Sequence, residues 1–336
     1  MHVELPKAIE LEQKVFNIHN EKELQSIALE VFRFQFGNNS LYRDFCRALH
    51  RHPGNVVKCE QIPFLPISFF KTHAICTTEF EPEMIFTSSG TTGITTSSHY
   101  VRSLQLYRTS FLTCFKRFYG DPSVYCILGL LPSYLEREGS SLVYMVDQLV
   151  KESGHADSGF YLHDTDRLDQ TLEKLENEGQ KTLLIGVTYA LLDFGRSHPR
   201  SLKHCNIMET GGMKGRKKEM TRQELYGELR SCFGTTRIYS EYGMTELLSQ
   251  AYAVDGKFLA PSWMKVFARD ETDPLTILDA RKQTVTGGLN IIDLANIYSC
   301  SFIATEDIAR IHPDESFEVL GRMDHSDIRG CSLLAI

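Results

Sequence analysis

The sequence lacks the basic charge, the long apolar runs and the paired cysteines that mark nucleic-acid-binding, membrane and disulfide-rich proteins. It has 36 lysines and arginines against 43 aspartates and glutamates, a formal net charge of −7, so no basic excess is present to bind nucleic acid. No segment approaches the roughly 18 consecutive apolar residues of a membrane-spanning helix, and the first residues, MHVELPKAIE, contain no charged and then apolar leader. We expect a cytoplasmic protein with no membrane span and no nucleic-acid partner.

Cysteine and histidine are present, but not at the spacing of known metal or catalytic motifs. The nine cysteines are an odd number and never form CxxC, which argues against a disulfide framework and a zinc knuckle and fits reduced thiols. The twelve histidines include no HExxH, and neither GxSxG nor HxxxD occurs. Serine hydrolase and HxxxD acyltransferase chemistry are therefore not expected.

Hydrophobic periodicity predicts three regions along the chain. Residues 1–83 form a helical lead-in packed on the core, because apolar side chains recur there at helical spacing. Residues 84–255 alternate short apolar runs with amphipathic stretches, which predicts an α/β core with a parallel sheet flanked by helices. Residues 256–336 carry short β-rich segments between Gly, Asp and Pro residues, which predicts a smaller β-rich subdomain.

Within the α/β core, individual elements can be assigned from the same patterns. The expected strands are 84–86, 124–131, 181–187 and 235–240. The expected helices are 102–118, 140–151, 165–177 and 217–232. A ligand site is then expected outside the carboxyl ends of the parallel strands.

The stretch FTSSGTTG, residues 86–93, is the first candidate for such a site. Its glycines allow positive φ and expose backbone N–H groups, and its hydroxyls add further donors, as a cradle for phosphate oxygens requires. We expect it to follow a strand at the point where that strand leaves the parallel sheet. The same composition is also common in ordinary surface loops, and the GKS or GKT of a Walker A motif is absent.

The stretch YGMTE, residues 242–246, is the second candidate. Glu246 offers a carboxylate for Mg²⁺, Thr245 a hydroxyl for a phosphate, and Tyr242 an aromatic face for a base. The alternative is a helix amino terminus with a capping Thr and an early Glu.

Together, SSGTTG and YGMTE resemble the adenylate-forming superfamily of acyl-CoA synthetases, adenylation domains and luciferases. GGMKG at 211–215 is similar to the glycine pair that this superfamily places beside the adenine. ATEDIARI at 304–311 resembles the segment whose aspartate binds the ribose, and GRMD at 321–324 resembles the Gly-Arg-x-Asp hinge region. All these motifs stand in the superfamily's order.

Longer segments narrow the resemblance to the acyl-protein synthetases of bacterial luminescence and their non-luminous relatives. The similar segments are IPFLPISFFK at 62–71, LPSYLEREGSSLVYM at 131–145, SEYGMTELLSQAY at 240–252 and the terminal DIRGCSLL. The resemblance implies the large domain of an adenylate-forming enzyme, with ATP and Mg²⁺ as cofactors.

The resemblance also implies a role for each matching residue. Glu246 would recruit Mg²⁺, Thr245 would contact the α-phosphate, Asp307 would bind the ribose, and Cys331 would accept the acyl group as a thioester. Thr245, Glu246 and Cys331 are thus the expected catalytic residues. The expected ATP-binding residues are Ser88, Ser89, Gly90, Thr91, Thr92, Gly93, Gly211, Gly212, Lys214, Glu241, Tyr242, Gly243, Met244, Asp307 and Arg322.

Two departures from the superfamily pattern bear on the chemistry. The phosphate loop is followed by ITTSS rather than by a lysine, and the sequence given ends shortly after Gly321. We therefore expect the mobile carboxyl-terminal domain, with its catalytic lysine, to be missing or vestigial. Lys214 and Arg216 are candidates for the absent cation, although such a basic run is also typical of a solvated charged face.

The expected activity is that of a long-chain fatty acid–protein ligase. ATP would activate a fatty acid to acyl-AMP, and the acyl group would pass to a protein cysteine and then to a fatty acid reductase or an acyl carrier. One alternative is a fatty or aryl acid ligase that delivers to coenzyme A or a carrier protein. Another is a non-catalytic subunit that binds a nucleotide or an acyl group.

Overall fold

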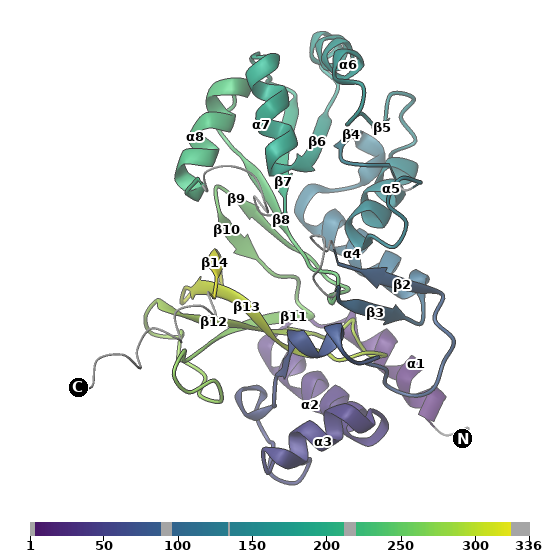
Figure 1. Cartoon of the computed structure of the whole chain (residues 1–336), viewed down its shortest axis with the longest axis vertical. Helices are drawn as coiled ribbons and strands as arrows, with labels where there is room; N and C mark the ends of the chain where they lie inside the picture. Colours follow the sequence, from purple (N-terminus) through teal and green to yellow (C-terminus); the bar gives the residue numbers. More distant parts are fainter. Residues whose placement is uncertain (1–3, 89–95, 134, 212–219, 324–336) are drawn as a thin grey trace, which may run out of the picture.

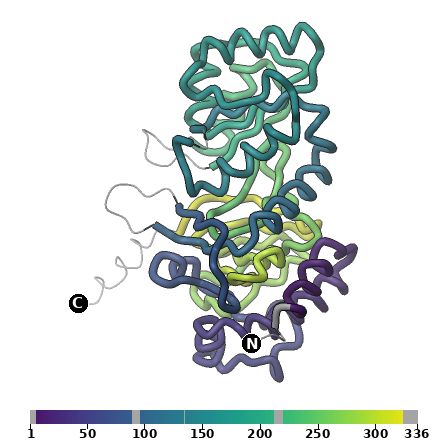
Figure 2. The backbone as a smooth tube through the Cα atoms, turned by 90° about the vertical axis from the view of Figure 1, so that its right-hand side faces the viewer, coloured from purple at the N-terminus to yellow at the C-terminus, as the bar shows by residue number. Residues whose placement is uncertain are grey.

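The computed structural model describes residues 4–88, 96–133, 135–211 and 220–323. The predicted roles of Ser89 to Gly93, Gly212, Lys214, Arg216 and Cys331 therefore concern residues outside the described ranges. In two views at right angles, the antiparallel strands lie between the amino-terminal helices and the parallel strands with their helices (Figures 1 and 2).

The chain opens with three helices, α1 (Glu4–Val15), α2 (Glu21–Asn38) and α3 (Ser40–Ala48). The Asn20 side chain accepts the backbone N–H of Glu23 and begins α2, as expected of an N-cap asparagine. Asn39 ends α2 and begins α3, because its side chain accepts the N–H of Tyr42. Short elements follow at η1 (Cys59–Gln61), β1 (Leu65–Pro66) and η2 (Ile67–Lys71).

The parallel part of the sheet confirms the predicted α/β class. Its strands are β4 (Cys126–Leu130), β5 (Gly159–Phe160), β6 (Thr182–Val187), β7 (Cys205–Thr210) and β8 (Tyr239–Tyr242). Adjacent strands pair in parallel in the order β8-β7-β6-β4-β5. All five residues of β4 are buried, as expected of a strand covered on both faces.

Helices cover both faces of these parallel strands (Figure 1). The helices are α4 (Leu104–Tyr119), α5 (Ser141–Ser153), α6 (Thr165–Glu178), α7 (Thr188–Ser197) and α8 (Arg222–Phe233), with η3 (Pro122–Val124) after α4. Ile127 belongs to the core cluster of α4 and α5, whereas Leu128 belongs to that of α6, α7 and α8. Successive side chains of β4 therefore point to opposite helical layers.

The sheet continues without a break into an antiparallel part. Its strands are β9 (Ala251–Val254), β10 (Lys257–Leu259), β11 (Met264–Arg269), β12 (Val285–Asp293), β13 (Phe302–Ile311) and β14 (Phe317–Arg322). Among the described residues the whole sheet has 12 strands, in the order β11-β12-β13-β14-β10-β9-β8 and on into the parallel part, with β1 paired to β13. The boundaries at residues 83 and 255 stay a prediction.

Two sequence predictions about single elements were wrong. β2 (Met84–Thr87) does not belong to the parallel sheet but pairs with β3 (Ser98–Val101) in a separate antiparallel hairpin. Only Phe86 of β2 is buried, a pattern that suits a half-covered hairpin rather than an inner parallel strand. Helix α8 begins at Arg222 rather than near Lys217, because Thr221 and Glu224 form a capping box there.

Within the part of the chain that the structure describes, no helix combines the length and the apolar character that a membrane crossing demands.

Candidate functional site

Two hydrogen bonds join Ser88 to Ser97, the residues on either side of the segment that contains the rest of SSGTTG. The N–H of Ser88 donates to the carbonyl of Ser97 (3.1 Å), and the N–H of Ser97 donates to Oγ of Ser88 (2.9 Å). Ser88 thus closes the base of the loop at the end of the β2–β3 hairpin. It is the one member of the predicted phosphate loop whose position the structure describes.

This hairpin lies directly against YGMTE. Nδ1 of His99, on β3, donates to the backbone carbonyl of Thr245 at 2.8 Å, although 146 residues separate the two. Burial lowers the pKa of His99 to about 4, so the imidazole is neutral at physiological pH and its hydrogen lies on the nitrogen that faces the carbonyl. The structure therefore places the hairpin that carries Ser88 against Thr245 of YGMTE.

Tyr242, Asp307 and Arg322 meet although they come from three different strands. The Tyr242 hydroxyl donates to Oδ2 of Asp307 at 2.7 Å, and Nε of Arg322 lies 3.6 Å from Oδ1 of the same carboxylate. Asp307 and Arg322 are directly opposite each other in the β13–β14 ladder. Burial and the neighbouring Asp307 carboxylate raise the pKa of Tyr242, so its hydroxyl remains a donor.

Two further aromatic rings pack against the Tyr242 ring. It meets Phe258 and Phe317 edge-on, with ring centroids 5.8 and 5.9 Å away. These contacts hold the tyrosine between β10 and β14, beside Asp307. The cluster of Tyr242, Asp307 and Arg322 is called the tyrosine–aspartate cluster below.

Thr245 and Glu246 lie in a loop between β8 and β9, not at the start of a helix. The helix-capping alternative for YGMTE is therefore wrong. The loop is held by its backbone: the Asn296 amide donates to the carbonyl of Glu246 at 2.7 Å, and Asp293 accepts the N–H groups of Leu248 and Ser249. The Glu246 side chain itself is only 5 % exposed.

Two buried carboxyl groups, those of Glu209 and Glu241, lie near the ends of β7 and β8. Oε2 of Glu209 accepts the hydroxyl of Thr188 at 3.2 Å, and Nη1 of Arg222 lies 3.6 Å from its Oε1. The Glu241 side chain accepts the hydroxyl of Thr210. Both glutamates are 7 % exposed, so Glu241, a predicted ATP-binding residue, points its carboxyl group into the core.

The local structure favours glycine at two positions of the predicted site, Gly211 and Gly243. Gly211 has φ of +70°, a left-handed conformation that L side chains rarely adopt. A Cβ at Gly243 would lie 2.6 Å from Oε1 of Glu241, so a side chain there would displace this buried carboxyl. Met244, the next predicted residue, is half-buried.

Replacing Glu241 by glutamine is expected to change how stability depends on pH. Burial, with a further contribution from neighbouring Glu209, raises the pKa of Glu241 from 4.5 to about 7. A carboxyl group whose pKa is raised by folding stabilises the folded state below pH 4.5, and this contribution is lost as the pH rises through 7. Glutamine does not titrate. The free energy of unfolding of Glu241→Gln, relative to the wild type, should therefore be about 2–3 kcal/mol higher at pH 8 than at pH 5.

Urea unfolding of both proteins at the two pH values measures this difference. The matched control is Glu315→Gln, because the side chain of Glu315 is 75 % exposed. An equal stability difference between Glu241→Gln and the wild type at both pH values contradicts the prediction.

The described residues fit Mg²⁺ only in combination with a nucleotide. No three His, Cys, Asp or Glu side chains are grouped to hold a metal ion anywhere in residues 4–88, 96–133, 135–211 and 220–323. In nucleotide sites, however, Mg²⁺ is commonly held by one or two carboxylates together with phosphate oxygens and water. The carboxylate of Glu246 would supply such an oxygen ligand for Mg²⁺.

Three residues that hold the site together were not predicted from the sequence: His99, Asp293 and Asn296. His99 stands five positions beyond the motif FTSSGTTGI, but nothing in its local pattern indicates a partner. Asp293 and Asn296 lie in NIIDLANIYS, which was assigned only to the β-rich region. Their roles depend on contacts with a distant segment of the chain.

The fold is that of the adenylate-forming enzymes. The ATP-bound MatB of Rhodopseudomonas palustris superposes with a TM-score of 0.52 and 15 % sequence identity, over 73 % of this chain and 50 % of that protein. A chimera, RpMatB-BxBclM B3, gives a TM-score of 0.51 and 14 % identity, over 73 % of this chain and 49 % of the other. This chain thus spans about half the length of these structures.

The sequence itself is similar to a long-chain-fatty-acid–luciferin-component ligase of Photorhabdus luminescens. The two are 37 % identical over 75 residues, which are 22 % of this chain and 64 % of the ligase. This similarity confirms the resemblance to the acyl-protein synthetases. No family model matches the chain.

Proposed function

We propose that the protein is an ATP-dependent acyl ligase that activates a carboxylic acid as its adenylate. The observation that carries this proposal is a hydrogen bond from His99 to the backbone carbonyl of Thr245, the residue before Glu246. His99 lies two residues beyond Ser97, which binds Ser88 at the base of the SSGTTG loop. The tyrosine–aspartate cluster supplies the other half of the nucleotide site. The adenylate-forming fold supports the same chemistry, and MatB is a neighbour with ATP bound.

In the first half-reaction, a carboxylate oxygen attacks the α-phosphorus of ATP. The new P–O bond forms as the bond to the β-phosphate oxygen breaks, and pyrophosphate leaves with that electron pair. Residues of this chain position the reactants: Asp307 for the ribose, Tyr242 for the base, and Thr245 for the α-phosphate. Mg²⁺ held by Glu246 would neutralise phosphate charge.

The second half-reaction in this proposal transfers the acyl group to Cys331. The thiolate attacks the acyl carbonyl, the C–S bond forms, and AMP leaves as the C–O bond to phosphate breaks. Arg329, two positions earlier in the chain, would favour the thiolate. The name of the Photorhabdus relative supports a long-chain fatty acid as the substrate.

The partner and the compartment belong to the same proposal. An acyl thioester on a protein is an activated intermediate, so a fatty acid reductase or an acyl carrier would have to consume it. A cytoplasmic location fits the described cysteines, which are all free thiols.

The experiment that tests the proposed function is carboxylate-dependent exchange of labelled pyrophosphate into ATP. The purified protein is assayed with Mg²⁺ and a panel of fatty and aryl acids of different lengths. Exchange that depends on long-chain fatty acids supports the proposal, and exchange with aryl acids alone favours the aryl ligase. If none of the acids supports exchange while ATP binds, the non-catalytic subunit is the better interpretation.

Replacing Cys331 by serine is expected to leave pyrophosphate exchange within about two-fold of wild type but to abolish the protein-bound thioester. The reason is that activation needs only the nucleotide site, whereas transfer needs the thiol. Labelled fatty acid that remains on the denatured protein and is released by hydroxylamine measures the thioester. The matched control is Cys232→Ser, a half-buried cysteine on α8, which should keep the label; undiminished label on Cys331→Ser rules out the assignment.

A further inference from the structure

The loop that carries Thr245 and Glu246 is held from two sides by buried side chains. On one side, Nδ1 of His99 donates to the Thr245 carbonyl at 2.8 Å. On the other, Nδ2 of Asn296 donates to the Glu246 carbonyl at 2.7 Å. His99 is 1 % exposed and Asn296 is fully buried, so water does not compete for these two carbonyl groups.

His99 belongs to the same hairpin as the phosphate loop. It lies opposite Phe86 in the β2–β3 ladder, two residues beyond Ser97, which closes the base of that loop. The His99 ring also meets Phe70 edge-on, with centroids 5.8 Å apart. A shift of the hairpin would therefore be transmitted to the backbone of Thr245.

Asn296 is in turn held from the amino-terminal helices. Nε2 of Gln35, on α2, donates to the carbonyls of Asn296 and Ile297, both at 3.0 Å. Oε1 of Gln35 accepts the N–H of Ser301 at 3.0 Å. These bonds fix the 296–301 segment and thereby hold the Asn296 amide within hydrogen-bonding distance of the Glu246 carbonyl.

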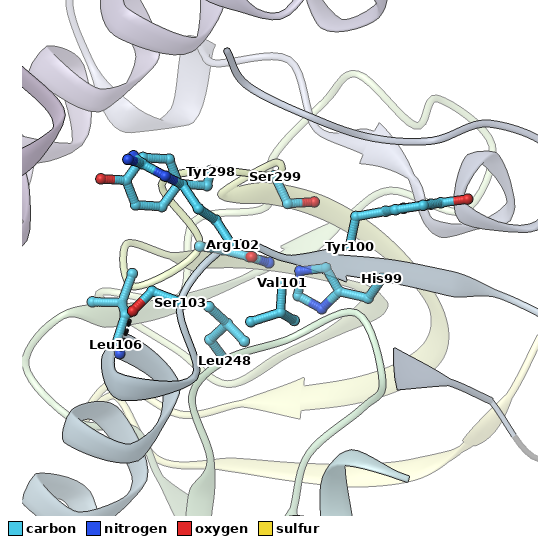
Figure 3. Close-up of a pocket in the computed structure, with 10 residues that line it drawn as sticks. His99, Tyr100, Val101, Arg102, Ser103, Leu106, Leu248, Tyr298 and Ser299 are labelled. Carbon is cyan, nitrogen blue, oxygen red and sulfur yellow. Dashed lines mark hydrogen bonds between the residues drawn. The ribbon is translucent and has the colours of Figure 1, made fainter. Parts of the chain in front are cut away.

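A small cavity lies beside His99 and Asn296. Its volume is about 10 Å³, and His99, Arg102, Leu248, Asn296, Tyr298 and Ser299 are among its lining residues (Figure 3). The Arg102 guanidinium lies 4.3 Å from the centroid of the Tyr298 ring beside this cavity. A cavity of that volume holds about one water molecule.

We propose that His99 is a positioning residue, which with Asn296 sets the backbone of Thr245 and Glu246 against the phosphate-loop hairpin. This inference rests on the proposed adenylation chemistry. The two side chains act through the carbonyl groups that they bind, and neither touches the reacting atoms. Loss of the His99 bond lets the loop shift, and displacements of about 1 Å can cost on the order of 100-fold in rate.

The first test compares His99→Phe with His99→Asn. Phenylalanine keeps the ring packing on Phe70 but cannot donate, whereas the asparagine amide can donate from nearly the same position as Nδ1. We expect His99→Phe to lower kcat for pyrophosphate exchange by about 10- to 100-fold, with the KM for the acid nearly unchanged. His99→Asn should stay within about five-fold of wild type, and His73→Phe, at an exposed histidine, serves as the control for the substitution.

The second test measures backbone hydrogen exchange and does not depend on activity. The N–H groups of Leu247, Leu248 and Ser249 are all hydrogen-bonded, so a peptide covering residues 243–250 should exchange slowly in the wild type. His99→Phe should exchange at least about 10-fold faster in this peptide, and His99→Asn should remain protected. Peptides from α6, far along the chain, report whether global unfolding is responsible.

Two results would overturn the inference. One is His99→Phe with wild-type kcat and wild-type protection of residues 243–250, even if its melting temperature falls. The other is equal loss in His99→Phe and His99→Asn, which would exclude the hydrogen bond as the cause. If the wild type shows no pyrophosphate exchange, the proposed function fails, and the hydrogen-exchange comparison still decides whether His99 holds the loop.

Discussion

Replacing Glu246 by glutamine is expected to lower fatty-acid-dependent pyrophosphate exchange by about 100-fold or more. Glutamine has nearly the same shape, so the buried position should still be filled. It has no negative charge, however, and is a much weaker ligand for Mg²⁺. The exchange rate measured over a range of Mg²⁺ concentrations should therefore show both a lower maximum and a higher Mg²⁺ requirement.

The matched control for this prediction is Glu306→Gln. Glu306 lies beside Asp307 in β13, but its side chain is partly exposed and pairs with Lys71 at 3.8 Å. Loss of a surface ion pair costs at most about 1 kcal/mol, and we expect exchange within about two-fold of wild type. Glu246→Gln with the same rate and Mg²⁺ dependence as the wild type would remove Glu246 as the metal ligand.

Replacing Asp293 by alanine is expected to lower the free energy of unfolding by about 3–5 kcal/mol. Asp293 is fully buried and accepts four hydrogen bonds, from the N–H groups of Leu248, Ser249 and Ala295 and from the Ser249 hydroxyl. Alanine leaves all four donors without this partner in a site that water does not reach. Urea unfolding at pH 7 measures the loss.

A second variant separates this network from a general effect of removing an aspartate. Asp44→Ala, at a side chain that is 73 % exposed, should change the free energy of unfolding by no more than about 0.5 kcal/mol. Ser249→Ala combined with Asp293→Ala should cost less than the sum of the two single changes, because they share one hydrogen bond. A loss below 1 kcal/mol in Asp293→Ala contradicts the prediction.

Asp293 also links stability to the proposed activity. It fixes the backbone of Leu248 and Ser249, and Ser249 accepts the indole N–H of Trp263 at 2.9 Å. The loop that begins with Thr245 is thus bound to Trp263, just before β11, and to Asp293 of β12, as well as to the β2–β3 hairpin. Any folded fraction of Asp293→Ala should show a lower kcat in pyrophosphate exchange, in addition to its lower stability.

The sequence alone predicted most helices and strands of the α/β core. Helix α6 (Thr165–Glu178) was predicted as 165–177, because its apolar side chains recur at helical spacing between Asp164, its N-cap, and Gly179, its C-cap. The buried strand β6 (Thr182–Val187) was predicted as 181–187 from its apolar run. These signals come from residues that are neighbours along the chain, so a local pattern contains them.

The tertiary structure decided how these pieces meet. No periodicity relates Tyr242 on β8 to Asp307 on β13, and β14, β10 and β9 lie between these two strands in the sheet, yet the Tyr242 hydroxyl donates to the Asp307 carboxylate in the folded chain. The strand predicted at 84–86 was wrongly assigned to the parallel sheet, because the sequence of so short a strand is similar in a hairpin and in a parallel sheet. His99 and Asn296 bind carbonyl groups, which every residue has, so their partners could not be inferred from side-chain types. The identity of the motifs was local information, whereas the contacts that position Thr245 and Glu246 depend on long-range pairing that only the folded chain defines.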